Sequence, residues 1–309
     1  MNPRAVSGIS KLETALAPPS PRSRLGFALK LIRKSAFRRA GGSHQLPAVV
    51  KPDQLGITFI GHASFLLQLA GLNILIDPVF AHWLVLVHRM RRPGVRVKDL
   101  PHIDLVLLTH AHMDHLNFPS LRRVIRRSRK LTGSAPMVIV PQQVEDLVNK
   151  LGFSEVRSAA WWEAINIGGV EITMTPCQHW GARVFTDSHR GFGGYVLRHC
   201  SHSVYHAGDT GYFPGFAEIR QRLYPKISML PIGAYQPHSF RRVHMSPEDA
   251  VKAFLDLGSE TLIPMHYGTF SLSEEPIDEP LPRLLRAAGN ANINDAVDTI
   301  GEGETRVFD

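Results

Sequence analysis

The stretch "LVLLTHAHMDHLNFPSL", residues 105–121, joins a run of apolar residues to a cluster of polar side chains. The apolar run ends at Thr109, and four side chains that commonly bind metal ions follow within six positions: His110, His112, Asp114 and His115. Zinc and related ions take imidazole nitrogen and carboxylate oxygen as ligands from proteins. The chain has 16 histidines, so single pairs arise by chance, but four such side chains in six positions indicate a metal site.

A strand that ends at Thr109 and a helix that begins near Pro119 would leave a short loop between them. The first two histidines of this loop are two positions apart and can hold one ion together. Asp114 and His115 can turn toward a second ion. One loop cannot complete two coordination shells, so further ligands must come from distant parts of the chain.

Apolar runs elsewhere in the chain end in the same way, on a residue that can bind or orient a metal ligand: Asp77, His179, Asp209 and His266. In sheet proteins, functional side chains collect at the ends of strands, where a rigid scaffold positions them from loops. The sequence therefore predicts that His179, Asp209 and His266 supply the missing ligands from distant strand ends.

The 309 residues are enough for one large domain with a sizeable core. Short apolar runs separated by Gly, Pro and Asp begin at residue 57, and ten of them read as strands. Helical patterns lie near 119–130, 142–151, 214–223, 247–257 and 280–288. This alternation predicts an α/β domain over residues 51–309, preceded by an N-terminal extension over residues 1–50.

Charge is concentrated in the extension. Residues 1–44 contain nine Lys and Arg and one acid, Glu13, which gives 9 − 1 = +8 and equals the net charge of the whole chain. The remainder is neutral, which is not typical of a nucleic-acid-binding protein. Residues 22–39 hold seven basic residues and no acid, with Leu25, Leu29 and Ile32 on one helical stripe. This composition predicts a helix that lies on an anionic membrane surface, although a basic tail would look similar.

The two cysteines, Cys177 and Cys200, cannot form a disulfide framework, and the first twenty residues lack the apolar segment of a secretory signal. No apolar run approaches the length of about 18 residues that a membrane-spanning helix needs. We therefore expect a cytoplasmic protein, with residues 22–39 able to hold it at the inner membrane surface. If the protein forms an oligomer, a dimer is expected.

The order of these residues resembles the metallo-β-lactamase superfamily in its two-metal form. Longer strings resemble one of its families, the N-acyl-phosphatidylethanolamine-hydrolysing phospholipases D, from about residue 55 onward: "GHASFLL", "ILIDPVF", "PCQHWGAR", "AGDTGYFPGF", "LPIGAY", "HMSPEDA" and "MHYGTF". One departure is Val243 before His244, where the mammalian members have Gln. This difference and the unmatched N-terminal extension concern the lipid substrate and leave the metal ligands unchanged.

The resemblance implies an αββα sandwich with the metal site at the edge between the two sheets. It implies two Zn²⁺ ions, other divalent transition metals being alternatives, held by seven ligands: His110, His112 and His179 on one ion, Asp114, His115 and His266 on the other, and Asp209 between them. Asp77 and His62 would support the ligands from behind. Asp114, Asp209 and His244 would take part in catalysis, and Tyr235 and Trp180 are expected near the substrate.

The activity that the resemblance implies is phospholipase D-type hydrolysis of N-acyl-phosphatidylethanolamine or a related glycerophospholipid. The same fold also opens lactones and carboxylic esters, because an activated water attacks carbonyl carbon as well as phosphorus. A nuclease is a further alternative, since "LRRVIRRSRK" at 121–130 is a basic helix, although a solvated helix face explains that charge equally well. A non-catalytic binding module on an inactive site is disfavoured, because all seven ligands are present.

Overall fold

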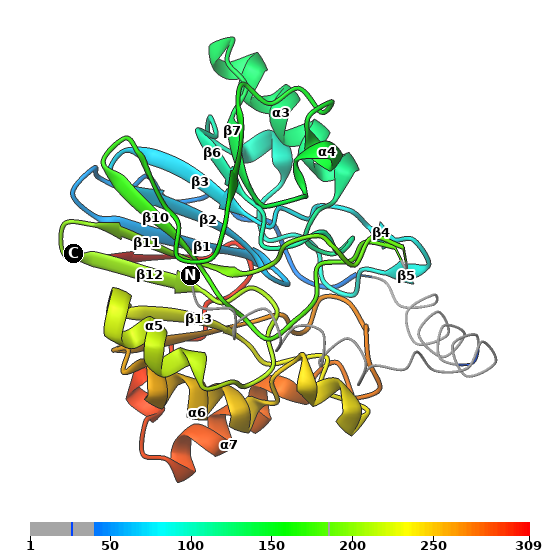
Figure 1. Ribbon diagram of the computed structural model, residues 1–309, viewed down its shortest axis with the longest axis vertical. Helices are drawn as coiled ribbons and strands as arrows, with labels where there is room; N and C mark the ends of the chain where they lie inside the picture. The colour runs from blue at the N-terminus through cyan, green and yellow to red at the C-terminus, as the bar shows by residue number, and fades with distance from the viewer. Residues whose placement is uncertain (1–25, 27–39, 185) are drawn as a thin grey trace.

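The computed structural model describes residues 26, 40–184 and 186–309. The apolar runs of the sequence form two sheets that face one another (Figure 1). The first sheet has the order β15-β1-β2-β3-β6-β7-β8. Its strands are β1 (Leu55–Gly61), β2 (Ser64–Leu69), β3 (Leu72–Ile76), β6 (Leu105–Leu107), β7 (Met137–Pro141), β8 (Val156–Ala159) and β15 (Thr305–Phe308).

The second sheet has the order β14-β13-β12-β11-β10-β9. Its strands are β9 (Ala164–Ile167), β10 (Val170–Thr175), β11 (Gly194–His199), β12 (His202–His206), β13 (Ile227–Pro231) and β14 (Thr261–Met265). A separate hairpin pairs β4 (Trp83–Leu84) with β5 (Val87–His88). All ten strands expected from the sequence are confirmed, whereas β4, β5, β8, β9 and β15 were not predicted.

Helices cover the outer face of each sheet (Figure 1). On the first sheet lie α3 (Phe118–Thr132) and α4 (Glu145–Val148), and on the second lie α5 (Gly215–Leu223), α6 (Pro247–Leu257) and α7 (Pro280–Asn290). Short 3₁₀ turns occur at Val97–Asp99, His238–Arg242 and Asn294–Ala296. This arrangement is the expected αββα sandwich, and the five helical patterns of the sequence are confirmed.

Alternating side chains on the first sheet divide between two layers of core. In β2, Phe65 and Leu67 belong to the cluster between the sheets, while Leu66 belongs to the cluster beneath α3 and α4. Successive side chains of a strand point to opposite faces, so a strand buried on both faces must be apolar throughout. This explains why the runs that predict these strands are continuous and do not alternate with polar residues.

Strand direction determines where the loops collect. In the first sheet β1, β3 and β6 run the same way, because β2 is antiparallel to both β1 and β3, and β3 is parallel to β6. In the second sheet β10, β12 and β14 also share one direction. Strands that run the same way end at the same edge of a sheet, so the loops that follow them gather there.

Helix caps fix where two of these loops end. Asn117 caps α3, its side chain accepting a hydrogen bond from the Ser120 amide at 3.1 Å. Ser246 and Asp249 form a capping box on α6, with Pro247 in the first turn. Such caps satisfy amide groups that have no partner within the helix and define its first residue. The two caps therefore hold the C-terminal ends of segments 110–116 and 243–245, where each segment joins its helix.

The expected helix over residues 22–39 lies outside the described residues, apart from Gly26. Of the extension, residues 40–50 are described, and they contact the domain: the Gln45 amide donates to the Gly94 carbonyl at 2.7 Å and the Ala48 amide to the Thr305 hydroxyl at 3.1 Å. The division at residue 50 stays a prediction. Within the described ranges, no helix is both long enough and apolar enough to cross a bilayer.

Candidate metal centre

Two groups of potential ligands lie next to each other at the edge where the co-directional strands end. The first group contains His110, His112, His179 and Asp209, and the second contains His62, Asp114, His115 and His266. Within each group the nitrogen and oxygen atoms that could bind an ion all lie within 4.8 Å of one another. The residues come from both sheets, through the loops that follow β1, β6, β10, β12 and β14.

The first group places three imidazoles around one point. The Nε2 atom of His110 lies 2.8 Å from Nδ1 of His112, and Nε2 of His179 lies 3.2 Å from the same atom. The rings of His110 and His179 are buried. Three nitrogen atoms at such separations can all bind one ion at about 2.0–2.1 Å.

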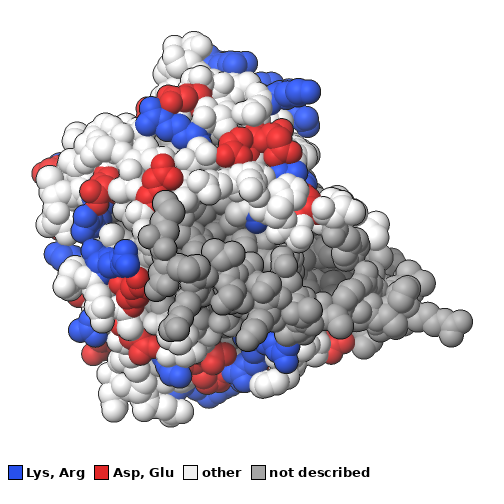
Figure 2. All heavy atoms as spheres, viewed as in Figure 1, with Lys and Arg blue, Asp and Glu red and all other residues white. Residues whose placement is uncertain are grey.

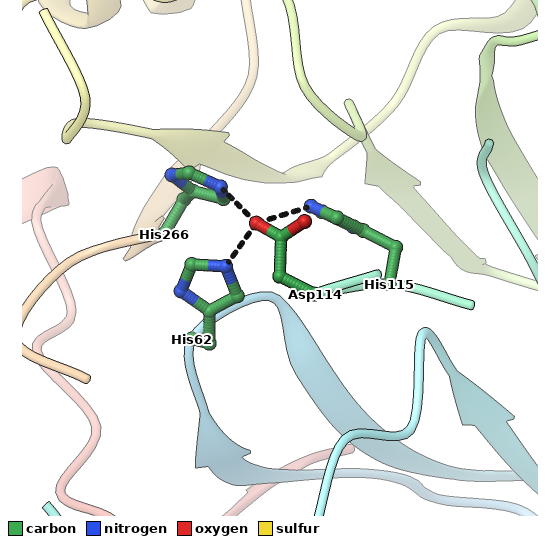
Figure 3. Close-up of side chains that lie close together, drawn as sticks. All are labelled: His62, Asp114, His115 and His266. Carbon is green, nitrogen blue, oxygen red and sulfur yellow. Dashed lines mark hydrogen bonds and ion pairs between the residues drawn. The ribbon is translucent and has the colours of Figure 1, made fainter. Parts of the chain in front are cut away.

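The second group is built around Asp114 (Figure 3). One of its carboxylate oxygens lies 3.0 Å from Nε2 of His62, 3.6 Å from Nε2 of His266 and 3.7 Å from Nε2 of His115. In Figure 3 all three rings point at this carboxylate from different segments of the chain. The sequence expected His62 to support the ligands from behind, and the structure places it in direct contact with Asp114.

Asp209 lies between the two groups. Its Oδ2 atom is 3.2 Å from Nε2 of His266 and 3.3 Å from Nε2 of His115, both in the second group. The same oxygen is 3.9 Å from Nε2 of His110 and 3.9 Å from Nε2 of His179, both in the first group. A single carboxylate thus faces ligands of both groups, which is the arrangement needed to bridge two ions.

Asp77 orients two of the histidines. Its Oδ2 atom accepts hydrogen bonds from His115 Nδ1 at 2.7 Å and from the Thr109 hydroxyl at 2.6 Å, and its Oδ1 atom accepts from the Thr109 amide at 2.8 Å. The Thr109 hydroxyl in turn accepts from His110 Nδ1 at 2.9 Å. Each ring therefore donates from Nδ1 and directs its Nε2 at the centre, which is the orientation of metal-binding histidines.

Two further contacts fix the second sheet's contribution. His179 Nδ1 donates to the Val243 carbonyl at 3.0 Å, which leaves Nε2 of His179 free for an ion. His244, the next residue, has its Nδ1 atom 3.8 Å from Asp209 Oδ2. The capping box fixes the start of α6 at Ser246. His244 is only two residues before this cap, so it is held beside the centre.

Three residues of the centre have a strained backbone. His62, Asp77 and His266 all have positive φ angles, of 61°, 43° and 60°. Residues with side chains seldom adopt this conformation, which costs free energy unless the surrounding structure enforces it, and such outliers cluster at functional sites. All three lie just beyond a strand end, where the chain must turn sharply to aim a side chain into the centre.

Burial and charge set the protonation of the histidines. Burial lowers the pKa of His112 and of His244 to about 4 and that of His62 to about 3. Burial also opposes the charged form of His266, but the carboxylates of Asp209 and Asp114 outweigh it and raise its pKa to about 9. The same carboxylates and Asp77 raise the pKa of His115. Without a cation, protons on these two rings balance the carboxylates, and a metal ion must displace them.

The donor set fits metal ions. Several buried atoms that face the centre have no hydrogen-bond partner in the described structure: Nε2 of His115 and of His266, Nδ1 of His244 and Oδ1 of Asp209. Buried polar atoms are nearly always paired, so unpaired atoms that converge on one point mark a binding site. Nitrogen-rich ligands with two carboxylates suit zinc and its first-row neighbours better than Mg²⁺ or Ca²⁺.

The comparisons with known proteins agree with this geometry. The family model for the beta-lactamase superfamily domain matches residues 72–267, which is more than half of the chain. The chain belongs to the beta-lactamase superfamily. This superfamily member is 32% identical to a metal-dependent hydrolase of Methanopyrus kandleri over 227 residues, covering 72% of this chain and 88% of the relative.

Two further similarities concern a curated relative and a solved structure. The superfamily member is 29% identical to the mitochondrial N-acyl-phosphatidylethanolamine-hydrolyzing phospholipase D of Saccharomyces cerevisiae, covering 82% of this chain and 56% of that one. Its fold matches the isothiocyanate hydrolase from Delia radicum gut bacteria with a TM-score of 0.66 and 24% identity, covering 82% of this chain and 98% of that chain. The protein is a metal-dependent hydrolase of the metallo-β-lactamase fold.

The two residues expected near the substrate differ in their placement. Trp180 is 38% exposed, and its ring centroid lies 4.3 Å from that of His179 and 4.9 Å from that of His112, at the rim of the centre. Tyr235 is buried, and its hydroxyl donates to Glu279 at 2.7 Å. The polar group of Tyr235 is therefore directed at the start of α7 and away from the ligands.

Arg183 supports the centre and was not singled out in the sequence. Its Nη1 atom donates to the carbonyls of Ala111 at 2.8 Å and Leu116 at 2.7 Å, which lie at either end of the ligand-bearing loop. Its guanidinium also stacks on Phe118, 4.3 Å from the ring centroid. The only available signal was the string "HWGAR", and the metal ligands themselves do not require an arginine at this position.

Gly208 provides a test of how closely Asp209 is positioned. Its φ angle is +62°, and an added Cβ would lie 2.9 Å from the Gly193 carbonyl oxygen and 3.1 Å from the Thr109 side chain. Gly208→Ala should destabilise the protein by about 1–3 kcal/mol and reduce its metal content, because the backbone before Asp209 must move. Thermal unfolding and elemental analysis measure the two effects.

Gly71→Ala is the matched control for this substitution. Gly71 also has a positive φ of +76°, but nothing lies within 4 Å of an added Cβ. This variant should lose some stability from the backbone conformation and keep its metal. If Gly208→Ala retains both stability and metal content, the close approach at this position does not position Asp209.

Proposed function

We propose that the centre holds two zinc ions and that the protein hydrolyses the phosphodiester bond of N-acyl-phosphatidylethanolamine or a related glycerophospholipid in the manner of a phospholipase D. The observation that carries the two-metal reaction is the Asp209 carboxylate, which faces both ligand groups at 3.2–3.9 Å. The substrate class rests on the likeness to the yeast phospholipase D and on the strings quoted above.

The proposed ligands divide between the two ions according to the groups. His110, His112 and His179 would hold one ion, Asp114, His115 and His266 the other, and Asp209 would contact both. His62 is close enough to Asp114 to hold its carboxylate in position. When bound, two zinc ions supply Lewis acidity toward the phosphoryl oxygens and make a water molecule nucleophilic at neutral pH.

The protein's own residues then have distinct tasks. Asp77 and Thr109 hold His115 and His110 in the tautomer that leaves Nε2 available. His244 lies beside Asp209, and because burial lowers its pKa to about 4 it is neutral at pH 7. A neutral imidazole there is suited to a hydrogen bond with the substrate or the leaving group. Trp180 would contact the substrate at the rim.

The proposal includes the location of the enzyme. A glycerophospholipid substrate requires access to a membrane surface, and residues 22–39 carry seven basic residues that favour an anionic one. A cytoplasmic protein at the inner membrane surface, as a monomer or a dimer, fits this composition. Nucleic acid is not the favoured partner, because the charge outside the extension balances to zero.

Hydrolysis of a lactone or a carboxylic ester is the alternative function. It is supported by the chemistry of the site, because an activated water attacks carbonyl carbon as well as phosphorus. Both reactions use the same ligands, so the metal centre alone does not separate them.

A product assay separates these functions. The purified protein, incubated with mixed phospholipids, should release phosphatidic acid, and its kcat/KM for an activated phosphodiester should exceed that for a lactone of similar size. Mass spectrometry of the lipid products and initial-rate measurements provide the two readouts. The opposite ranking of kcat/KM would favour the carbonyl hydrolase, and substantial cleavage of RNA would favour a nuclease.

A further inference from the structure

The β4–β5 hairpin exposes an apolar tip. Trp83, Val85 and Leu86 are 50%, 70% and 54% exposed, while Leu84 between them is buried. Val85, at the turn, has a φ of 53°, which is rare for a β-branched side chain. The turn therefore adopts an unfavourable backbone conformation while three large apolar side chains remain in contact with water. Neither feature contributes to the stability of the described domain.

The base of the hairpin is firmly held. Leu84 packs with Val79 and Phe270 in a small cluster of its own. Arg89, which is fully buried, donates from Nη1 to the Val79 carbonyl at 2.9 Å and from Nε to the Arg91 carbonyl at 2.7 Å. The apolar tip thus projects from a rigid support, so its exposure is a fixed property of the surface.

The same support adjoins the metal centre. Phe270 makes an edge-to-face contact with His62, with 5.3 Å between ring centroids, and His62 contacts Asp114. Val79 follows Asp77 by two positions, directly after the strand end that orients His115. A partner bound at the hairpin would therefore lie close to the centre.

Basic side chains flank the hairpin. Arg92 and Arg123 are exposed, and after burial and the charges of Arg89 and His88 they help to lower the pKa of His82, the residue before the hairpin. The exposed face of α3 adds Arg122, Arg126 and Lys130. In Figure 2 the upper end of the molecule, where α3 lies in Figure 1, carries Lys and Arg side chains interspersed with Asp and Glu. In the described part of the chain, none of these five pairs with a carboxylate, so their charge is available to an anionic partner.

We infer that the tip formed by Trp83, Val85 and Leu86 inserts into the surface of an anionic phospholipid bilayer, with Arg92 and Arg123 facing the lipid phosphates. Three apolar side chains on a projecting turn with basic neighbours match the interfacial region of such a bilayer, where apolar groups reach the acyl chains and cations meet the headgroups. This inference rests on the proposed lipid substrate and adds a docking surface next to the centre.

The test measures binding to vesicles, which does not depend on turnover. The full-length protein is incubated with sucrose-loaded vesicles of phosphatidylglycerol and phosphatidylcholine, and the bound fraction is measured by sedimentation. Val85→Asp/Leu86→Asp should lower the partition coefficient at least about tenfold, because it places two anions at the inserted tip. Arg92→Gln/Arg123→Gln should weaken binding to the anionic vesicles and reduce its salt dependence.

Leu255→Asp/Leu285→Asp is the matched control. These leucines are 49% and 43% exposed on α6 and α7, and this variant should sediment with vesicles like the wild type. Turnover of a soluble phosphodiester should be unchanged in the hairpin variant, so failure of the proposed substrate and failure of the docking surface give different results. Equal vesicle binding by wild type and hairpin variant would overturn the inference.

Two other binding partners of the hairpin tip would be recognised by different experimental results. If the hairpin variant changes the oligomeric state in light scattering and leaves vesicle binding unchanged, the tip contacts a second copy of the chain. If it increases proteolysis within residues 1–39 with unchanged vesicle binding, the tip contacts the chain's own N-terminal segment. Either result would overturn the membrane assignment.

Discussion

Asp209→Ala is expected to abolish turnover and to remove metal from both ligand groups. The carboxylate faces His110 and His179 on one side and His115 and His266 on the other, whereas Asp114 lies against the histidines of the second group. Residues that only orient a metal ligand typically contribute about 10- to 100-fold to metal affinity or activity, so loss of a shared ligand should exceed about 100-fold. Without this carboxylate, the imidazoles also lose the charge that attracts a cation.

Elemental analysis and initial rates measure this effect. The wild type should contain close to two transition-metal ions per chain, and the variant should contain markedly fewer. His199→Ala is the control, because His199 lies in the β11–β12 hairpin, where its ring contacts the Gly169 carbonyl at 2.9 Å, and this variant should keep both metal and turnover. An active wild type with one ion or none would contradict the two-metal proposal.

Asp77→Asn is expected to lower metal affinity by about 10- to 100-fold while the protein still folds. Both carboxylate oxygens of Asp77 accept hydrogen bonds, and an asparagine can accept at only one of them. If its amide NH₂ faces His115, the ring must accept at Nδ1 and carry its proton on Nε2, where it can no longer bind an ion. A buried donor without a partner should also reduce stability by about 1–3 kcal/mol.

A chelator competition titration with zinc, together with thermal unfolding, measures the two effects. Thr109→Ser retains the hydroxyl that links Asp77 to His110 and should bind zinc like the wild type, whereas Thr109→Val removes it and should bind more weakly. Zinc affinity unchanged in Asp77→Asn would show that this carboxylate does not set the tautomer of His115.

The strands of the core could be predicted from the sequence because they are buried on both faces. Strands such as β2 and β3 read as continuous apolar runs, since one face packs between the sheets and the other packs under α3. The strands that were not predicted are short and more exposed. β9 alternates exposed and half-buried residues along its four positions, and β15 forms the outer edge of the first sheet. Edge strands bury too few side chains to leave a clear pattern.

The predicted metal ligands are brought together because each follows a strand that ends at one edge, and strand ends are visible in a sequence. The contact between His62 and Asp114 could not be predicted from the sequence in this way. It depends on a backbone turn with positive φ between β1 and β2, which no local pattern specifies. Tyr235 illustrates the opposite case: its hydroxyl partner, Glu279, lies 44 positions further along the chain, and only the packing of α7 determines that contact.

The two layers of the sandwich are joined at their shared edge by the ligands themselves. Asp114 and His115 follow the first sheet, whereas His266 and Asp209 follow the second, so an ion held by all four would cross-link the layers. An ion that binds only the folded chain at a free concentration of 100 Kd adds about 2.7 kcal/mol of stability. Through thermodynamic linkage, the supply of whichever ion binds there would then determine the stability of the fold as well as turnover.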